Sequence, residues 1–105
     1  MQALIQVLTA LPDRDAALSL ARELVEARLA ACVQIVDPMT SVYRWEGQMH
    51  EDRETLCVMK TPEDRLDALV ERIRARHPYD TPEISSVPCS FTDDRYLGWA
   101  VAETR

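Results

Sequence analysis

One stretch of nine residues gathers many of the side chains that could bind a ligand. The sequence "RHPYDTPEI", residues 76–84, contains a histidine, a tyrosine, two carboxylates and two prolines. Side chains of these types can line a binding site. The same stretch can equally turn a corner, because Pro78 is expected to end a preceding helix and Asp80 and Pro82 suit a turn.

The three cysteines do not form a recognisable chemical motif. Cys32, Cys57 and Cys89 are odd in number and widely spaced, which suits neither a disulfide framework nor a structural zinc site, so we expect small buried hydrophobic residues. Only two glycines occur, and no Ser-His-Asp pattern, Gly-rich phosphate loop or pair of catalytic carboxylates can be identified. We therefore expect a protein without catalytic activity.

The composition indicates one soluble domain. The 105 residues are 47% hydrophobic and 29% charged, and we expect a single domain over residues 1–105. A net charge of -6 disfavours nucleic acid and anionic membrane surfaces as partners. The first fifteen residues show neither a basic leader nor a long apolar run, so we predict a cytoplasmic protein without a membrane span.

The first half of the chain predicts a strand, a helix and a long hairpin. Residues 3–10 are apolar and β-branched, and an amphipathic helix should begin after Asp13 as its N-cap. A strand over residues 32–45, with a bulge or bend at Pro38, should reverse at Glu46 and Gly47, and the return strand should run from Gln48 to Lys60.

The second half predicts a helix, an edge strand and a closing helix. Thr61 should cap the helix, Pro62 should take its first position, and its apolar stripe consists of Leu66, Leu69, Val70 and Ile73. Residues 83–91 suggest a last edge strand, and Thr92 should cap the closing helix. The order predicts an α+β fold, a ferredoxin-like βαββαβ sandwich with a long hairpin between its second and third strands and a short C-terminal helix.

Two features indicate a homo-oligomer. The hairpin arm from Val33 to Trp45 would extend roughly 40 Å, about twice an ordinary strand, and should project with Tyr43 and Trp45 as interface anchors. Residues 56–59, "LCVM", are apolar on both strand faces, although helices cover only one face of this fold. Other subunits could cover the second face; the alternative is the C-terminal helix of the same chain.

Four ordered segments resemble the CutA family of divalent-cation tolerance proteins. They are "LVEARLAACVQI", "SVYRWEGQMHEDRETLCVMKT", "HPYDTPEI" and "YLGW", and together they span nearly the whole chain. The resemblance implies a cytoplasmic homotrimer of ferredoxin-like subunits, without enzymatic activity, that contributes to tolerance of copper and other divalent metals. Gln34, Met39 and Gln48 depart from the family pattern, which affects only local turn and bulge details.

The same resemblance implies a metal site at Cys32, Glu54 and His77. A thiolate, a carboxylate and an imidazole suit Cu²⁺ or another divalent cation, and no organic cofactor is expected. In this fold Cys32 and His77 should lie at opposite ends of the sheet, and Glu54 should pair with Met39, so the site would have to form between subunits. Alternatively, Cys32 is a core residue, Glu54 faces solvent, and His77 bonds the last helix carbonyls.

The leading hypothesis is therefore a non-enzymatic homotrimer that binds divalent cations at inter-subunit sites and contributes to copper tolerance. The alternative is a trimeric signalling protein like the PII regulators, which would bind a small metabolite in the cleft between subunits. If residues 76–84 bind any ligand, we expect His77, Tyr79 and Glu83 to line a cleft whose other wall is a neighbouring subunit. A third possibility is a structural trimer that anchors another protein.

Overall fold

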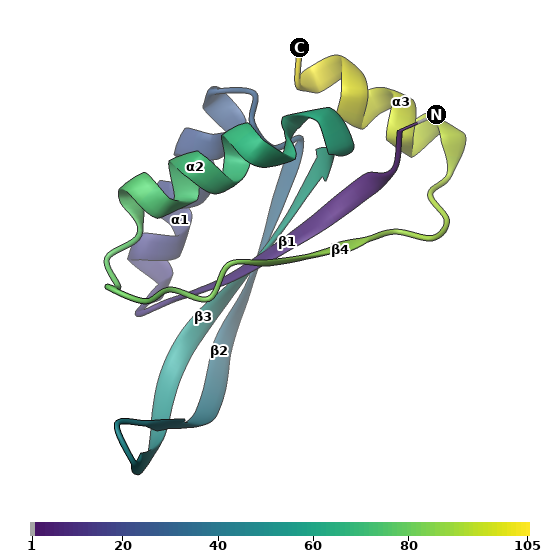
Figure 1. The fold of residues 1–105 in the computed structure, drawn as a ribbon. Coiled ribbons are helices and arrows are strands. Elements are labelled where there is room, and N and C mark those ends of the chain that lie inside the picture. Colours follow the sequence, from purple (N-terminus) through teal and green to yellow (C-terminus); the bar gives the residue numbers. More distant parts are fainter. Residues whose placement is uncertain (1) are drawn as a thin grey trace.

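The computed structural model describes residues 2–105 as an α+β sandwich (Figure 1). Its four strands form one antiparallel sheet in the order β2-β3-β1-β4. This is the predicted ferredoxin-like topology, with an added C-terminal helix. The elements are β1 (Leu4–Leu11), α1 (Arg14–Glu26), β2 (Cys32–Trp45), β3 (Gln48–Pro62), α2 (Leu66–Arg76), β4 (Ser85–Pro88) and α3 (Asp94–Glu103).

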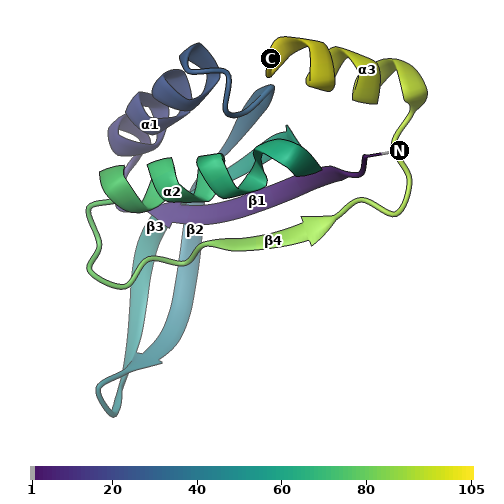
Figure 2. The same cartoon turned by 45° about the horizontal axis from the view of Figure 1, so that its top comes forward.

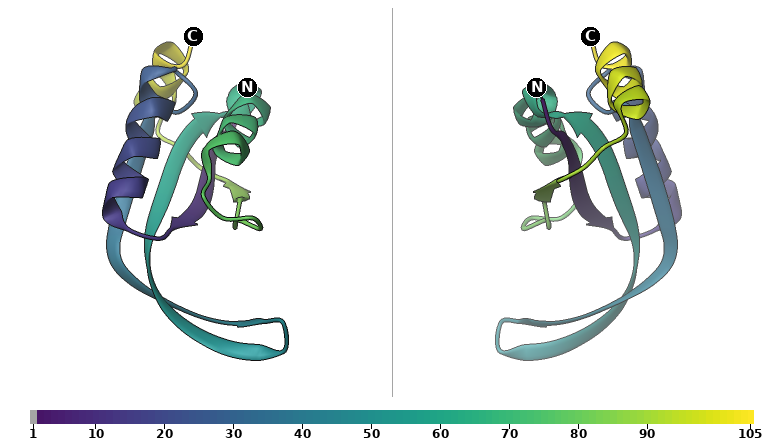
Figure 3. Two further views of the ribbon diagram at one scale, coloured as in Figure 1. Left: turned by 90° about the vertical axis from the view of Figure 1, so that its left-hand side faces the viewer. Right: turned by 90° about the vertical axis from the view of Figure 1, so that its right-hand side faces the viewer.

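Helices α1 and α2 lie on the same face of the sheet, in front of it in the left panel of Figure 3 and behind it in the right panel. The core between them consists of alternate strand residues and the buried helix stripes, because successive strand side chains point to opposite faces. Its fully buried members include Val7, Cys57, Met59, Leu24 and Leu69. The predicted cap of α1 is confirmed, since the Asp13 carboxylate accepts a hydrogen bond of 2.8 Å from the Ala16 N–H.

Three predicted boundaries were wrong. Thr61 does not cap α2; it is a buried residue of β3 whose hydroxyl donates to the Leu29 carbonyl at 2.8 Å. Pairing with β1 continues β3 as far as Pro62, so the chain enters α2 through a 3-10 turn at Glu63–Arg65. The last strand is limited to the residues that β1 pairs, Ser85–Pro88, and Asp93 rather than Thr92 caps α3.

The hairpin of β2 and β3 projects beyond the body of the domain. Its turn is at Glu46 and Gly47, whose φ angles of 51° and 78° are both in the left-handed region that two-residue hairpins require. The register shifts between Val36 and Met39, around Pro38, as predicted. Strand β1 pairs with β3 only from Thr55 onward, so the distal arms pair only with each other and bend away from the sheet (Figure 3).

Within residues 2–105, the face of the sheet opposite α1 and α2 is covered only at one end. Helix α3 lies at the end remote from the hairpin tip, where Ala100 packs with Leu4 and Ala31 (Figure 1). Elsewhere this face is open, and Val36 on β2 and Val87 on β4 are 50% and 52% exposed. Strand β4 forms an edge of the sheet beside β1 (Figure 2). The C-terminal helix thus covers part of the face, as the alternative prediction allowed.

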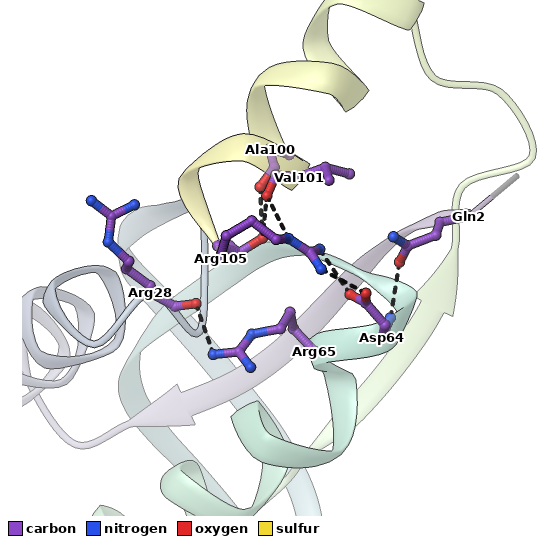
Figure 4. Close-up of polar contacts among 8 residues, drawn as sticks. Gln2, Arg28, Asp64, Arg65, Ala100, Val101 and Arg105 are labelled. Atoms are coloured by element: carbon purple, nitrogen blue, oxygen red, sulfur yellow. Dashed lines mark hydrogen bonds and ion pairs between the residues drawn. The ribbon is translucent and has the colours of Figure 1, made fainter.

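Polar contacts fasten α3 to the neighbouring elements (Figure 4). The Arg105 guanidinium donates to both oxygens of Asp64 at 2.8 and 3.0 Å, and its Nε donates to the Val101 carbonyl. Arg65 donates to the Arg28 carbonyl at 3.3 Å. The bonds between Arg105 and Asp64 hold the end of α3 beside the 3-10 turn that precedes α2, and the Arg65 bond joins that turn to the segment after α1. None of the helices within residues 2–105 combines the length and apolar composition of a membrane span.

Candidate functional site

Residues 76–84 form a corner that is fastened by His77. Helix α2 ends at Arg76, and the His77 backbone is already extended. The His77 Nε2 is 2.9 Å from the Ala10 carbonyl, and Nδ1 accepts the Tyr79 N–H at 3.2 Å. These partners assign the neutral tautomer protonated at Nε2. Burial lowers the pKa of His77, which favours the same neutral form.

His77 therefore bonds β1 rather than the last carbonyls of its own helix, so that sequence interpretation was wrong. Both ring nitrogens are engaged within the chain. A metal ion needs a free lone pair on one ring nitrogen, and the Nδ1 lone pair points at the Tyr79 N–H. Metal binding by His77 would require this bond to break.

Two tyrosines connect the corner and the hairpin to carboxylates. The Tyr79 hydroxyl donates to the Glu54 carboxylate at 2.9 Å, and the Tyr43 hydroxyl donates to Asp52. Burial, and then the bond to Glu54, raise the pKa of Tyr79 far above its usual value. The bond to Asp52 is the largest cause of the raised pKa of Tyr43. Both phenols thus remain protonated donors at physiological pH.

These residues line a cleft of about 670 Å³ between the distal hairpin and the loop after α2. Ala10 contributes to the cleft from the end of β1. Each arm of the hairpin contributes the side chains of one face to the cleft. Directly paired residues share a face, and the pairs are Tyr43 with His50, Ser41 with Asp52, and Met39 with Glu54. Within residues 2–105 no basic side chain lines the cleft. Its charged and aromatic residues are Asp52, Glu54, Asp80, Glu83, Tyr43, Trp45 and Tyr79.

Of the three residues implied to hold a metal, the structure brings two together. The Glu54 carboxylate accepts a hydrogen bond from the Tyr79 hydroxyl, and the Tyr79 backbone N–H donates to His77. The predicted pairing of Glu54 with Met39 is confirmed. Cys32 is elsewhere, at the start of β2, where it pairs with Lys60.

The separation of Cys32 from the corner is too large for one metal ion. Ala10, the partner of His77, pairs with Leu56, four residues along β3 from Lys60. Cys32 and Ala10 are therefore separated by about 13 Å along the strands and by about 10 Å, two strand spacings, across the sheet. Because metal–ligand bonds are about 2 Å long, one chain cannot join Cys32 to His77. Among residues 2–105 no three His, Cys, Asp or Glu side chains are placed to hold a metal ion together.

The cysteines differ in environment. Cys57 is fully buried, and burial raises the pKa of its thiol to about 11, so it behaves as the small core residue that was predicted. Cys32 and Cys89 are only half-buried, which corrects that prediction for two of the three. Cys32 lies against the Tyr96 phenol, whose pKa is raised by burial and, to a lesser extent, by this contact.

The sequence identified only part of the cleft. Of the three residues expected to line one, Tyr79 and Glu83 do so and His77 does not, and the facing wall in this structure is the hairpin of the same chain. The sequence assigned Tyr43 and Trp45 to an interface and gave no role to Asp52. The available signal was the alternation along the hairpin, which places Tyr43, Asp52 and Glu54 on one side of the paired arms. That alternation could have grouped an aromatic ring with two carboxylates.

The fold and the cleft together define a ferredoxin-like α+β domain with a projecting hairpin and a ligand-sized acidic depression at its base. Within that class, residues 5–103 match the family model described as the CutA1 divalent ion tolerance protein. The chain belongs to this family, which confirms the resemblance derived from the four motifs.

Known relatives agree with this assignment. The divalent-cation tolerance protein CutA of Thermus thermophilus is 45% identical over 93 residues, which cover 89% of this chain and 90% of that protein. The chloroplastic protein CutA of Arabidopsis thaliana is 42% identical over 101 residues; the match covers 96% of this chain and 56% of that longer protein. The solved Thermus thermophilus structure has a TM-score of 0.93 at 42% identity, covering 97% of this chain and 99% of that one.

Proposed function

We propose that this chain is a non-enzymatic homotrimer that contributes to divalent metal tolerance by binding Cu²⁺ or another divalent cation between its subunits. The observation that carries the proposal is the family match over residues 5–103, since the family is described by divalent ion tolerance. The net charge of -6 on this chain favours cations near its surface. We place it in the cytoplasm, while noting that the Arabidopsis relative is named chloroplastic.

Assembly is supported by apolar surface that one chain leaves uncovered. Met49 and Val42 on the hairpin are 72% and 62% exposed, and the open sheet face adds Val36 and Val87. Apolar side chains that gather on an exposed surface mark interaction sites in soluble proteins. A second copy that covers the sheet face and pairs with the free edge of the hairpin would bury both. The number three is an expectation from the family resemblance.

Assembly would also bring the three proposed metal ligands together. Glu54 and His77 lie at the corner of one subunit, and Cys32 is too far away in the same chain. We infer that the metal takes Glu54 and His77 from one subunit and Cys32 from a neighbour. Thiolate, imidazole and carboxylate together suit Cu²⁺. Binding would require His77 to release the Tyr79 N–H from Nδ1.

Calorimetric titration of the purified protein with Cu²⁺ tests the site. The variants Cys32→Ser, Glu54→Gln and His77→Ala should each weaken binding, whereas the matched controls Cys89→Ser and His50→Ala should bind like the wild type. Equal copper affinity in the first three variants and the wild type would refute the named site. Light scattering checks the assembly separately, because a stable monomer at micromolar concentration would refute the trimer.

A second candidate function is favoured by the cleft. A volume of about 670 Å³ is within the range of small-molecule sites, and most of its lining comes from the hairpin and the corner loop. This supports the alternative of a PII-like signalling trimer that binds a small metabolite near a subunit boundary. Saturable binding of an organic ligand by protein stripped of metal would distinguish it from the first candidate.

A further inference from the structure

We propose that the cleft between the distal hairpin and the corner loop binds a linear aliphatic polyamine. The proposal rests on the second candidate function, the binding of a small metabolite, and names the chemical class of that metabolite. It uses the shape of the cleft, the sign of its charges and the aromatic character of its walls. None of these depends on Cys32.

The charges of the cleft select a cationic ligand. Four carboxylates line it, two on the hairpin and two on the corner loop, and among residues 2–105 no basic side chain balances them there. Asp52 and Glu54 each accept a tyrosine hydroxyl on one oxygen, and the other oxygen makes no hydrogen bond within the described chain. These free oxygens can accept from ammonium groups. Nucleotides and other phosphate ligands would be repelled.

The aromatic walls select an organic cation over a hydrated metal ion. Tyr43, Trp45 and Tyr79 line the cleft, and in the single chain they are 41%, 50% and 36% exposed. Aromatic faces attract ammonium groups and also cover the methylene groups between them. A compact divalent ion would require three or more ligands close together, and the cleft presents no such group in the described chain.

The dimensions indicate a chain with several charges rather than a single ammonium. The carboxylates occupy two opposite walls, since Asp52 and Glu54 are on the hairpin, whereas Asp80 and Glu83 are on the loop. A ligand with one charge could satisfy one wall only. A flexible diamine or triamine can place ammonium groups against both walls, with its methylene segments beside the tyrosine and tryptophan rings.

Calorimetric titration of the full-length assembled protein with spermidine, after removal of metal by a chelator, tests the proposal. We expect saturable binding that weakens at least tenfold in an Asp52→Asn/Glu54→Gln double variant, and butylamine should bind much less tightly. A double variant on α2, Asp67→Asn/Glu71→Gln, removes the same charge outside the cleft and should bind like the wild type. Cys32→Ser should also retain binding. Circular dichroism checks that each variant folds.

A second measurement keeps the test valid if the double variant does not fold. In a Trp99→Phe background, Trp45 is the remaining tryptophan, and its fluorescence should change on addition of spermidine, with a weaker response in Glu83→Gln. Absence of binding at millimolar spermidine, or equal binding by the cleft and α2 double variants, would overturn the proposal. If a nucleotide binds but spermidine does not, the polyamine is wrong while the second candidate function stands. Copper titration of the same samples tests the proposed metal site independently.

Discussion

Replacement of His77 by alanine distinguishes a structural role for this side chain from a role as a metal ligand only. In the structure the imidazole connects the end of β1 to the corner after α2, through the Ala10 carbonyl at 2.9 Å and the Tyr79 N–H at 3.2 Å. His77→Ala removes both hydrogen bonds. We expect the free energy of unfolding to fall even when no metal is present.

The magnitude follows from those two bonds. A typical hydrogen bond contributes about 1 kcal/mol net, and a partner left unsatisfied costs more only where water cannot reach it. His77 is half-buried, so water can partly replace the lost contacts. We therefore expect a loss of about 1–2 kcal/mol. For a domain of about 100 residues, this loss lowers the midpoint temperature of thermal unfolding by roughly 4–15 °C.

Urea titration in the presence of a chelator, at one fixed protein concentration, measures this loss. Fixed concentration matters because assembly makes apparent stability depend on it. The control is His50→Ala, the other histidine, which stacks on the Tyr43 ring at 5.3 Å and should cost less than about 0.5 kcal/mol. Equal stability of His77→Ala and the wild type would show that the bonds assigned to the ring do not stabilise the corner.

Other elements give sharper local tests. Leu24→Ala should lower the free energy of unfolding by about 3–5 kcal/mol, because Leu24 is fully buried; a urea titration showing less than 1 kcal/mol would contradict the assigned core. Glu46→Gly should stabilise the hairpin by up to about 1 kcal/mol and Gly47→Ala should destabilise it, since both positions have positive φ; calorimetric unfolding measures both. Asp64→Asn should accelerate hydrogen exchange in α3 by weakening the bond to Arg105. Because Arg105 lowers the pKa of Asp64, this stabilisation is present at neutral pH and is lost as pH falls through that lowered value, which exchange measured across acidic pH should show.

Local patterns were sufficient to predict the order of the strands and the hairpin, but not the end of β3 or the extent of β4. The Glu46-Gly47 pair sets the turn, and a two-residue turn determines the register, so the pairing of Met39 with Glu54 followed by counting. Thr61 shows the limit of local patterns. Threonine suits both an N-cap and a strand. Thr61 belongs to a strand because β1, more than fifty residues earlier in the chain, pairs with β3 through Pro62.

The candidate site was only partly predictable for the same reason. The types of residue in the corner loop were visible, but the partner of His77 is the carbonyl of Ala10, 67 positions away, and a backbone carbonyl carries no sequence signal. The bond from Tyr79 to Glu54 likewise joins the loop to a strand that no local pattern connects to it. Side-chain alternation indicates which residues share a face, whereas the approach of the loop to the hairpin depends on the tertiary fold.

The two proposed ligands share one corner of the molecule, and this links them. Glu54 belongs both to the proposed metal set and to the cleft, and it already accepts the Tyr79 hydroxyl. Metal binding by His77 would free the Tyr79 N–H and so disturb the ring that forms a wall of the polyamine site. If both ligands bind, each must therefore weaken the other by the same factor, since binding linkage is reciprocal. The corner would then respond to the ratio of divalent metal to polyamine rather than to either alone.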